Sequence, residues 1–249
     1  MTRAVVAPAP CVIVHVVYHL GVGGLENGLV NLINRLPPER FRHHIVSLTD
    51  YTDFARRIDR DDVELHALHK RPGHDWRMYM QLFRLFRRLR PDIVHSRNLA
   101  ALEAQLPAWL AGVPCRIHGE HGRDVLDVDG TNRRYILQRR LLRPFVQHFI
   151  ALSRDLEGYL LERIGVRPGR LSRIINGVDV ERFRPDAECA RLPVGFAAAD
   201  SIVIGSVGRL AAIKDQLSLV RAFIRLRAML PEFAQRLRLV LIGEGGERA

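Results

Sequence analysis

The sequence predicts an α/β protein with two Rossmann-like, doubly wound parallel sheets, the second of them incomplete. Short runs of β-branched and aliphatic residues alternate with longer runs of helical periodicity along almost the whole chain. Glycine-rich turns follow strand-like runs at residues 21–28 and 243–246. The alternation stops once, at residues 184–200, and then begins again. These three observations indicate two α/β domains joined by a linker.

The first predicted domain covers residues 1–183. Its first strand is CVIVHVVY, and the helix that follows ends at Pro37-Pro38. Further strands are expected in HHIVSL, VELHAL, DIVHS, CRIHG, VQHFIALS and LSRIIN. Ser153 is expected to cap a helix that runs to Ile164. The buried stripe of the first helix is predicted to consist of Leu25, Leu29, Leu32, Ile33 and Leu36.

The second predicted domain begins at residue 201, after a linker over residues 184–200 that has no clean periodicity. SIVIGSVG and RLVLIG are expected to be strands, and LAAIKDQLSLVRAFIRL a helix between them. Fewer than 50 residues remain from Ser201 onward, whereas a domain of this type needs roughly 100–150. We therefore expect residues 201–249 to be the start of a truncated domain. The inward face of its helix is predicted to carry Leu217, Val220, Phe223 and Ile224.

The charge balance favours an anionic partner. The chain has 38 Lys and Arg against 27 Asp and Glu, a net charge of +11. In LFRLFRRLRP, Arg84, Arg87 and Arg88 fall on a face away from the leucines, and residues 133–143 form a second basic segment. Such faces fit either ordinary solvated helices or docking to anionic lipid headgroups. A membrane surface is therefore a candidate partner.

Other features narrow the location and the chemistry. No apolar run approaches the roughly 20 residues of a membrane-spanning helix, and the N-terminus lacks a signal-peptide pattern, so we expect a cytoplasmic protein. Cys11, Cys115 and Cys189 are far apart and lack metal-ligand spacing. Neither a disulfide nor a cysteine zinc site is predicted.

The glycine-rich turn GVGGLENG follows the first strand directly. Gly23 and Gly24 would let backbone amides and a helix N-terminus approach an anionic or sugar group beyond the carboxyl end of the sheet. The turn is not GxGxxG, and no acidic residue ends a second strand at the dinucleotide-binding spacing, so a nicotinamide cofactor is not expected. A turn that serves packing alone is the alternative.

A second candidate site lies in VGRLAAIKD. Arg209 and Lys214 bracket a strand-to-helix turn, where two cations and several backbone amides could converge on one diphosphate. Fixed positive groups aimed at a departing nucleoside diphosphate lower the reaction barrier without a metal ion. Two unrelated surface cations are the alternative interpretation.

The order of seven motifs resembles one enzyme family. The motifs are GVGGLE, DIVHSRN, EHGRD, ALSRDLEGYL, IINGVDVERFRP, GSVGRLAAIKD and VLIGEGGE. Together they resemble the retaining, nucleotide-sugar-dependent glycosyltransferases of family 4, the glycosyltransferase group 1 superfamily, which have the GT-B fold. Within it, the sequence looks most like the branch associated with bacterial exopolysaccharide and exosortase (PEP-CTERM) systems.

The resemblance implies a transferase that moves a sugar with retention from a nucleotide-sugar donor to a lipid-linked or growing saccharide. It implies that His121, Arg209 and Lys214 act in catalysis, the two cations at the donor diphosphate and His121 beside the transferred sugar. No cofactor or metal ion is expected, and the protein would work in the cytoplasm or at the inner face of the cytoplasmic membrane. The family's glutamate-rich donor motif is missing, which supports the prediction of a fragment.

The remaining site residues follow from the same resemblance. Asn176 to Asp179 would mark the passage between domains. The donor-binding group is Gly23, Gly24, Arg209, Lys214, Gly243 and Gly245. The group expected at the acceptor side or in the cleft is His95, Asn98, Glu120 and Arg123.

Three alternatives stay open. HGEHGRD could supply metal ligands, but strand alternation places His118 and Glu120 on one face and His121 on the other, so no metal is predicted. A nucleotide-sugar epimerase or hydrolase would use the same fold. A basic nucleic-acid-binding module would explain the charge, but no recognition motif is present and no nucleic-acid partner is expected.

Overall fold

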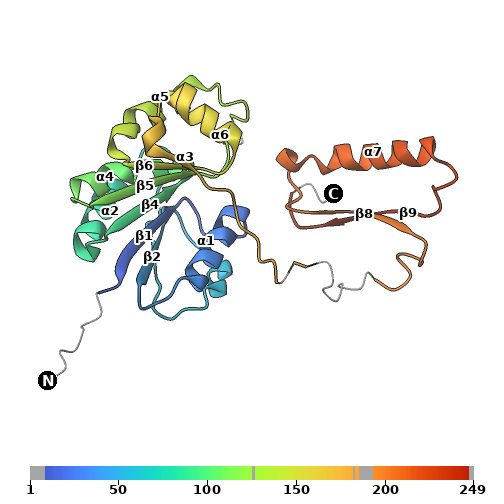
Figure 1. Cartoon of the computed structure of the whole chain (residues 1–249), viewed down its shortest axis with the longest axis horizontal. Coiled ribbons are helices and arrows are strands. Elements are labelled where there is room, and N and C mark those ends of the chain that lie inside the picture. Colours follow the sequence, from blue (N-terminus) through green and yellow to red (C-terminus); the bar gives the residue numbers. More distant parts are fainter. Residues whose placement is uncertain (1–8, 125–126, 182, 185–192, 247–249) are drawn as a thin grey trace. The chain divides into compact units, whose positions relative to one another are not determined.

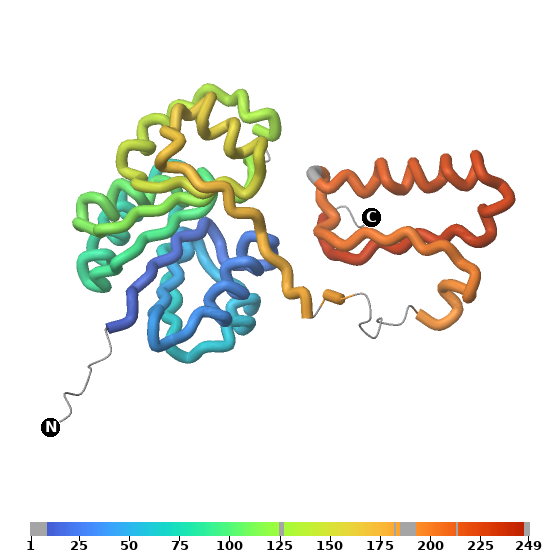
Figure 2. The backbone as a smooth tube through the Cα atoms, viewed as in Figure 1, coloured from blue at the N-terminus to red at the C-terminus, as the bar shows by residue number. Residues whose placement is uncertain are grey.

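The computed structural model describes residues 9–124, 127–181, 183–184 and 193–246. The chain divides into two compact units, Met1–Gly177 and Val178–Ala249 (Figure 1). The backbone trace follows the first unit from blue to yellow and the second through orange to red (Figure 2). The predicted first domain ended a few residues later, at 183. Residues 185–192 of the predicted linker lie outside the described residues.

The first unit is built on a parallel sheet of seven strands, which confirms the predicted α/β class. The order is β3-β2-β1-β4-β5-β6-β7, and every neighbouring pair is parallel. All carboxyl ends therefore lie along one edge, and the order reverses between β1 and β4, where open α/β sheets bind ligands. The strands are β1 (Cys11–Val17), β2 (Phe41–Ser47), β3 (Glu64–Ala67), β4 (Ile93–Arg97), β5 (Cys115–Glu120), β6 (His148–Ala151) and β7 (Leu171–Arg173).

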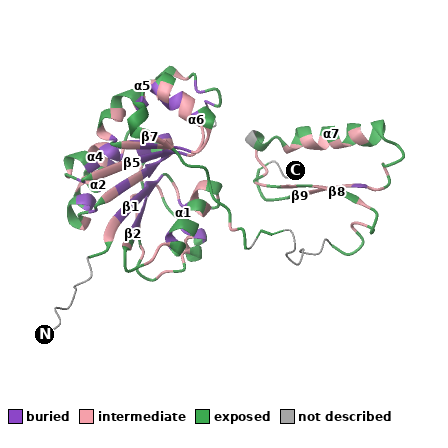
Figure 3. Ribbon diagram, in the orientation of Figure 1, coloured by how far each residue is buried: buried purple, intermediate pink, exposed green. Residues whose placement is uncertain are grey.

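Apolar side chains that alternate along the strands bind helices to both faces. Val17 and Ile45 on one face pack with helix α1 (Gly24–Arg35) and the 3₁₀ turn η1 (Asp53–Arg57). The opposite face holds two further clusters, built on β1, β2 and β4 and on β6. Figure 3 shows this buried layer in purple. The helices of the opposite face are α2 (Trp76–Leu89), α3 (Asn98–Leu102), α4 (Gln105–Leu110), α5 (Arg133–Leu142), α6 (Arg154–Gly158) and the π-helix η3 (Tyr159–Ile164), with short 3₁₀ turns η2 (Arg143–Phe145) and η4 (Pro168–Arg170) nearby.

Several local predictions can be compared directly. Ser153 caps α6 by accepting the Leu156 N–H at 3.1 Å, and the helix continues as η3 to Ile164, as predicted. The predicted stripe of α1 is wrong at Leu32, which is exposed, and it omitted Val30, which is buried. The helix starts at Gly24 and thereby turns position 30 toward the sheet.

The second unit contains two parallel strands, β8 (Ile202–Val207) and β9 (Leu237–Ile242). Helix α7 (Gln216–Met229) starts later than predicted, after the 3₁₀ turn η5 (Ala212–Lys214), because Asp215 caps it through the Ser218 N–H. Leu217 and Ile224 are 57% and 62% exposed, which contradicts the predicted inward face. No helix in the described part of the chain is long and apolar enough to cross a membrane.

Candidate functional site

A short hydrogen bond joins the carboxyl ends of β4 and β5. The Asn98 side-chain oxygen accepts the backbone N–H of His121 at 2.7 Å. Asn98 has a left-handed φ of 58°, which asparagine tolerates better than most residues. This conformation begins α3 immediately after β4. Two of the predicted site residues are thereby brought together.

Two imidazoles lie above Gly119 at the same edge. A Cβ atom at Gly119 would be 2.8 Å from Nε2 of His121 and 3.2 Å from Nε2 of His95. The missing side chain therefore provides the space in which both rings lie. Nε2 of His95 and both ring nitrogens of His121 are buried and have no hydrogen-bond partner within the part of the chain that the structure describes. Buried polar atoms are nearly always paired, so these nitrogens are placed to bind a polar ligand.

A buried arginine stands next to the two histidines. Arg97 is 4% exposed, and its guanidinium donates to Nδ1 of His15 at 3.2 Å. Because that nitrogen accepts, His15 carries its proton on Nε2 and donates to Nδ1 of His43 at 3.0 Å. No carboxylate in the described part of the chain forms an ion pair with Arg97. The positive charge of Arg97 is thus not neutralised by an ion pair and can interact with a ligand at the edge of the sheet.

The buried charge sets the protonation of its neighbours. Burial lowers the pKa of Arg97 to about 10, so the guanidinium is still charged at neutral pH. Burial and then the Arg97 charge lower the pKa of His121 to about 4, and they hold the pKa of His95 well below its usual value. Both imidazoles are therefore neutral at pH 7, and each can donate one hydrogen bond and accept another.

Glu120 points to the opposite face of β5, away from His121. Its carboxylate receives Nε of Arg139 at 2.7 Å and Nη2 at 3.2 Å, and Nε2 of His118 lies 3.4 Å away. Burial acts to raise the pKa of Glu120, but the hydrogen bonds from His118 and Arg139 outweigh it and hold the pKa at about 2. The predicted separation of His118 and Glu120 from His121 is confirmed. Glu120 serves to attach α5 to the sheet rather than to line the edge.

Arg123 also has structural partners. It donates to the Val128 carbonyl oxygen at 2.9 Å and to the carboxylate of Asp155 at 2.8 Å, and its guanidinium lies over the Tyr159 ring. These contacts hold the loop after β5 against α6. A direct role for Arg123 in binding an acceptor stays a prediction.

The glycine turn after β1 forms the N-terminus of α1. Gly23 is the N-cap residue with an extended backbone, and no side chain caps the helix through a hydrogen bond. Gly24 has nothing within 4 Å of where a Cβ would lie. The carboxylate of Glu26, in the first turn, lies against Gly23, where a Cβ atom would collide with it, and so occupies the positive end of the helix dipole.

The second unit brings its own predicted residues together. Backbone hydrogen bonds from Gly208 to Ile242 and from Leu210 to Glu244 hold the loops after β8 and β9 side by side. Any side chain at Gly243 or Gly245 would collide with the backbone of the facing loop. Arg209 and Lys214 are both exposed on the β8 loop, and the Arg209 carbonyl oxygen accepts Nε2 of Gln216. The two cations thus lie on one exposed loop, beside the neighbouring loop that carries the glycine pair.

Sequence reasoning missed Arg97, His15 and Gly119. His15 stands among aliphatic residues within its strand, which is a signal of a buried polar group, whereas Arg97 follows Ser96 at the end of its strand and gives no such signal. Their partners lie on a different strand, so the sequence alone gave no means of pairing them. The missed group lies beside the predicted residues His95, Asn98 and His121, and these six form the candidate site of the first unit.

The fold and this polar edge place the protein among Rossmann-like α/β proteins that bind ligands at the carboxyl ends of parallel strands. Residues 22–182 match the family described as Glycosyltransferase Family 4. The chain therefore belongs to this family.

Two curated relatives and one solved structure define the likeness further. The chain is 26% identical over 90% of its length to the UDP-Gal:alpha-D-GlcNAc-diphosphoundecaprenol alpha-1,3-galactosyltransferase of Escherichia coli, and spans 59% of that protein. It is 44% identical over 61% of its length to the D-inositol 3-phosphate glycosyltransferase of Stackebrandtia nassauensis, and spans 36% of that protein. The structure of Anabaena Alr3699/HepE in complex with UDP and glucose matches with a TM-score of 0.68 at 14% identity, covering 94% of this chain and 70% of that one. The last likeness supports the GT-B fold.

The Glu120–Arg139 pair yields a stability prediction. Replacing Glu120→Gln leaves Arg139 buried without its counter-charge, so we expect the free energy of unfolding at pH 7 to fall by about 3–5 kcal/mol. As a control, Asp53→Asn removes one partner of the exposed Arg56–Asp53 ion pair and should change the free energy of unfolding little. Urea unfolding measures both.

The same pair predicts how stability depends on pH. The pKa of Glu120 is about 2 in the folded protein and ~4.3 in the unfolded chain. The ionised carboxylate therefore stabilises the fold fully at pH values above ~4.3, and this stabilisation is lost as the pH falls toward the folded pKa. The difference in the free energy of unfolding between wild type and Glu120→Gln should become smaller below about pH 5. A difference that stays constant down to pH 3 would contradict the assignment.

Gly119 can be tested through the two histidines above it. In Gly119→Ala, the new Cβ would lie 2.8 Å from Nε2 of His121, and we expect the imidazole to move at a cost of roughly 1–3 kcal/mol. Imidazole nitrogen NMR signals of His95 and His121 should shift. In the control Gly28→Ala, the new methyl meets nothing within 4 Å and lies in a helix. Unchanged imidazole signals in Gly119→Ala would show that the ring positions are wrong.

Proposed function

We propose that the protein transfers a sugar, with retention, from a nucleotide-sugar donor to a hydroxyl of a lipid-linked or growing saccharide in exopolysaccharide biosynthesis. The observation that carries this proposal is the edge site of a family 4 chain, in which unpartnered neutral imidazoles of His95 and His121 lie beside the Arg97 cation. The E. coli relative is named for a diphosphoundecaprenol-linked acceptor and UDP-Gal, and the Anabaena structure contains UDP and glucose. Both names support this donor and acceptor chemistry.

The first unit supplies groups suited to sugar hydroxyls. A neutral imidazole both donates and accepts hydrogen bonds, as a hydroxyl does, and its low pKa prevents a second positive charge from forming next to Arg97. His121 would then contact the transferred sugar. The N-terminus of α1 at Gly23 and Gly24 would receive an anionic oxygen of donor or acceptor in place of the Glu26 carboxylate, which would have to move away from Gly23.

The second unit supplies charge for the leaving group. As the bond from the anomeric carbon to the diphosphate oxygen breaks, negative charge accumulates on the diphosphate. Arg209 and Lys214, exposed on one loop, would stabilise that charge, and Gly243 and Gly245 would let the nucleotide approach the backbone. With two fixed cations in this role, we propose that transfer needs no divalent metal ion.

The test of the function starts from binding. The purified protein is screened against nucleoside diphosphates and nucleotide sugars by saturation-transfer NMR, and the donor that binds is then supplied with saccharide and lipid-linked acceptors. Transfer only with an acceptor, giving an anomer identical to that of the donor, supports the proposal. Conversion of the donor without any acceptor indicates an epimerase or hydrolase instead. The absence of binding to every nucleotide would overturn the donor assignment.

Charge removal in the β8 loop gives a kinetic prediction. Arg209→Ala or Lys214→Ala should lower kcat by about 10²–10³-fold, since each removes a fixed charge from the departing diphosphate. Arg225→Ala removes the same charge from an exposed position on α7 and should leave kcat unchanged. Rates within twofold of wild type for both loop variants would refute their role.

Helix α2 supports a peripheral position at an anionic membrane. Its exposed residues Trp76, Met80, Arg84, Arg87 and Arg88 recur at helical spacing and so share one face. The opposite face is buried through Met78, Leu82, Leu85 and Phe86. An exposed aromatic and a methionine next to three arginines fit the interface of an anionic bilayer, and we place the enzyme at the inner face of the cytoplasmic membrane.

Vesicle binding tests this surface. The triple variant Arg84→Ala, Arg87→Ala and Arg88→Ala should lose most of its co-sedimentation with phosphatidylglycerol vesicles, because each arginine contributes about 1 kcal/mol near an anionic surface. The control variant Arg221→Ala, Arg225→Ala and Arg227→Ala removes the same charge from exposed positions on α7. Equal binding by both variants would show that net charge, not this face, governs attachment.

A further inference from the structure

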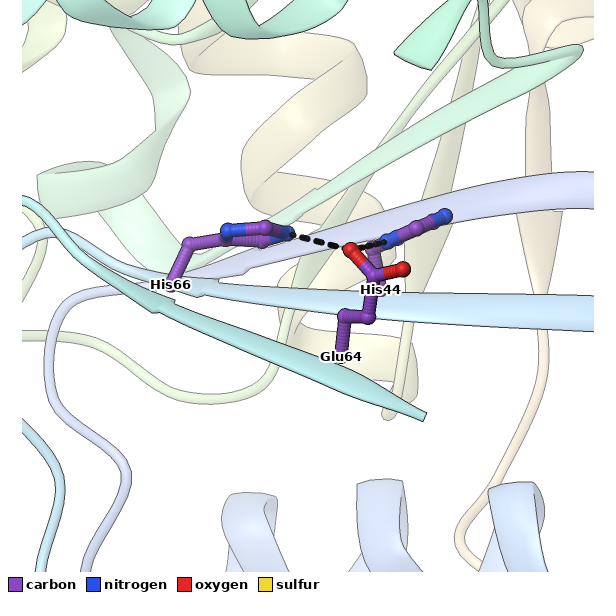
Figure 4. Close-up of side chains that lie close together, drawn as sticks. All are labelled: His44, Glu64 and His66. Atoms are coloured by element: carbon purple, nitrogen blue, oxygen red, sulfur yellow. Dashed lines mark ion pairs between the residues drawn. The ribbon is translucent and has the colours of Figure 1, made fainter. Parts of the chain in front are cut away.

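Three side chains with metal-ligating atoms meet at the β3 edge of the sheet, away from the carboxyl-edge site. His44 comes from β2, and Glu64 and His66 come from β3. In the parallel register His44 is opposite Glu64 and Val46 is opposite His66, so alternation puts all three on the same face. Figure 4 shows the two imidazoles pointing toward the Glu64 carboxylate from either side.

The distances approach those of a coordination site. Nδ1 of His44 is 3.4 Å from Oε2 of Glu64, and Nε2 of His66 is 3.7 Å from the same oxygen. All three ligand atoms lie within 4.8 Å of one another. Ligands at 2.0–2.2 Å from a tetrahedral ion are separated by roughly 3.3–3.6 Å. The two distances to the Glu64 oxygen already match this spacing, and a small rotation of the imidazoles would close any remaining difference between the two nitrogens.

The two imidazole nitrogens are only weakly satisfied in the fold. Nδ1 of His44 and Nε2 of His66 are buried, and among the described residues neither has a hydrogen-bond partner of good geometry, although both lie near the Glu64 carboxylate. The two rings stack at 5.7 Å with an interplanar angle of 25°, which holds their orientation. A buried nitrogen without a partner costs free energy unless a ligand satisfies it. Two such nitrogens converging on one carboxylate are therefore evidence of a missing ligand.

The charges around the group allow a cation. Burial lowers the pKa of His44 and of His66, so both side chains keep the lone pair that a metal ion needs. Glu64 supplies one negative charge. Arg42 and Arg88 also face the group and oppose a cation electrostatically. The affinity of the group for a metal ion must then come mainly from coordinate bonds to the two imidazoles, since the negative charge of Glu64 alone is not enough.

We propose that His44, Glu64 and His66 bind Zn²⁺, with a water molecule in the fourth position on the solvent side of Glu64. Two imidazoles and one carboxylate are a donor set typical of zinc with an open position. The ion would cross-link the edge strand β3 to β2, where β3 has only four residues to pair. These ligands lie in HHIVSL and VELHAL, whose sequence pattern predicts only strands, and not in HGEHGRD, where the histidines are closest together in the sequence.

The test uses the whole chain with its three cysteines changed to serine, so that thiols cannot compete for the metal. After dialysis against a chelator, Zn²⁺ is titrated calorimetrically, and the melting temperature is measured with and without Zn²⁺. We expect one Zn²⁺ per chain and a higher melting temperature on binding. Visible absorption of the Co²⁺ form should have the intensity of tetrahedral coordination.

Two ligand variants and one control decide the result. Glu64→Gln and His66→Gln should each weaken Zn²⁺ binding by at least about tenfold and abolish the thermal shift. His69→Gln changes an exposed histidine near Asp50 and should bind as wild type does. Circular dichroism of the metal-free variants shows whether they fold. Absence of stoichiometric binding, or equal affinity in either ligand variant and wild type, would overturn the proposal.

Discussion

The buried carboxylate of Glu120 determines how the centre of the carboxyl edge is arranged. A buried charge without a partner costs several kcal/mol, so Glu120 requires the Arg139 guanidinium, and this requirement fixes α5 against β5. Gln105 donates to Ser96, whose hydroxyl lies 2.8 Å from Nδ1 of His118, and His118 then reaches Glu120. Because Glu120 is held on this face, His121 must face the other way.

On that other face, Arg97 is a buried positive charge, and no carboxylate among the described residues pairs with it. Its field disfavours a second cation, and together with burial it keeps the neighbouring imidazoles neutral. A histidine whose pKa is about 4 is mostly unprotonated at neutral pH but too weakly basic to remove a proton from a sugar hydroxyl efficiently. The site is therefore suited to hydrogen bonding and to charge stabilisation, which fits a reaction driven by loss of an anionic leaving group.

The sequence was sufficient for the strands and insufficient for the contacts across them. The central strands β1, β2 and β4 each contain a short run of β-branched or aliphatic residues, which is a local signal, and His95, Asn98 and His121 follow from motif resemblance. The Arg97–His15 contact joins residues 82 positions apart, which no local pattern reports. In α7, the predicted stripe was wrong at Leu217 and Ile224, because spacing within one helix does not show which of its faces packs against the strands. The partly buried stripe of that helix is Leu219, Val220, Phe223 and Leu226.

The consecutive residues His43 and His44 show how much depends on strand register. His43 faces the Arg97 side and accepts from His15, whereas His44 faces the opposite side and meets Glu64 and His66. A slip of one residue would exchange the two faces, placing each imidazole among the wrong partners and moving Ile45 out of its apolar cluster. Polar groups buried on both faces of β2 thus oppose any register but the observed one, since only this register gives each imidazole its polar neighbours. The constraint that fixes β2 beside β1 therefore also supports the carboxyl-edge site.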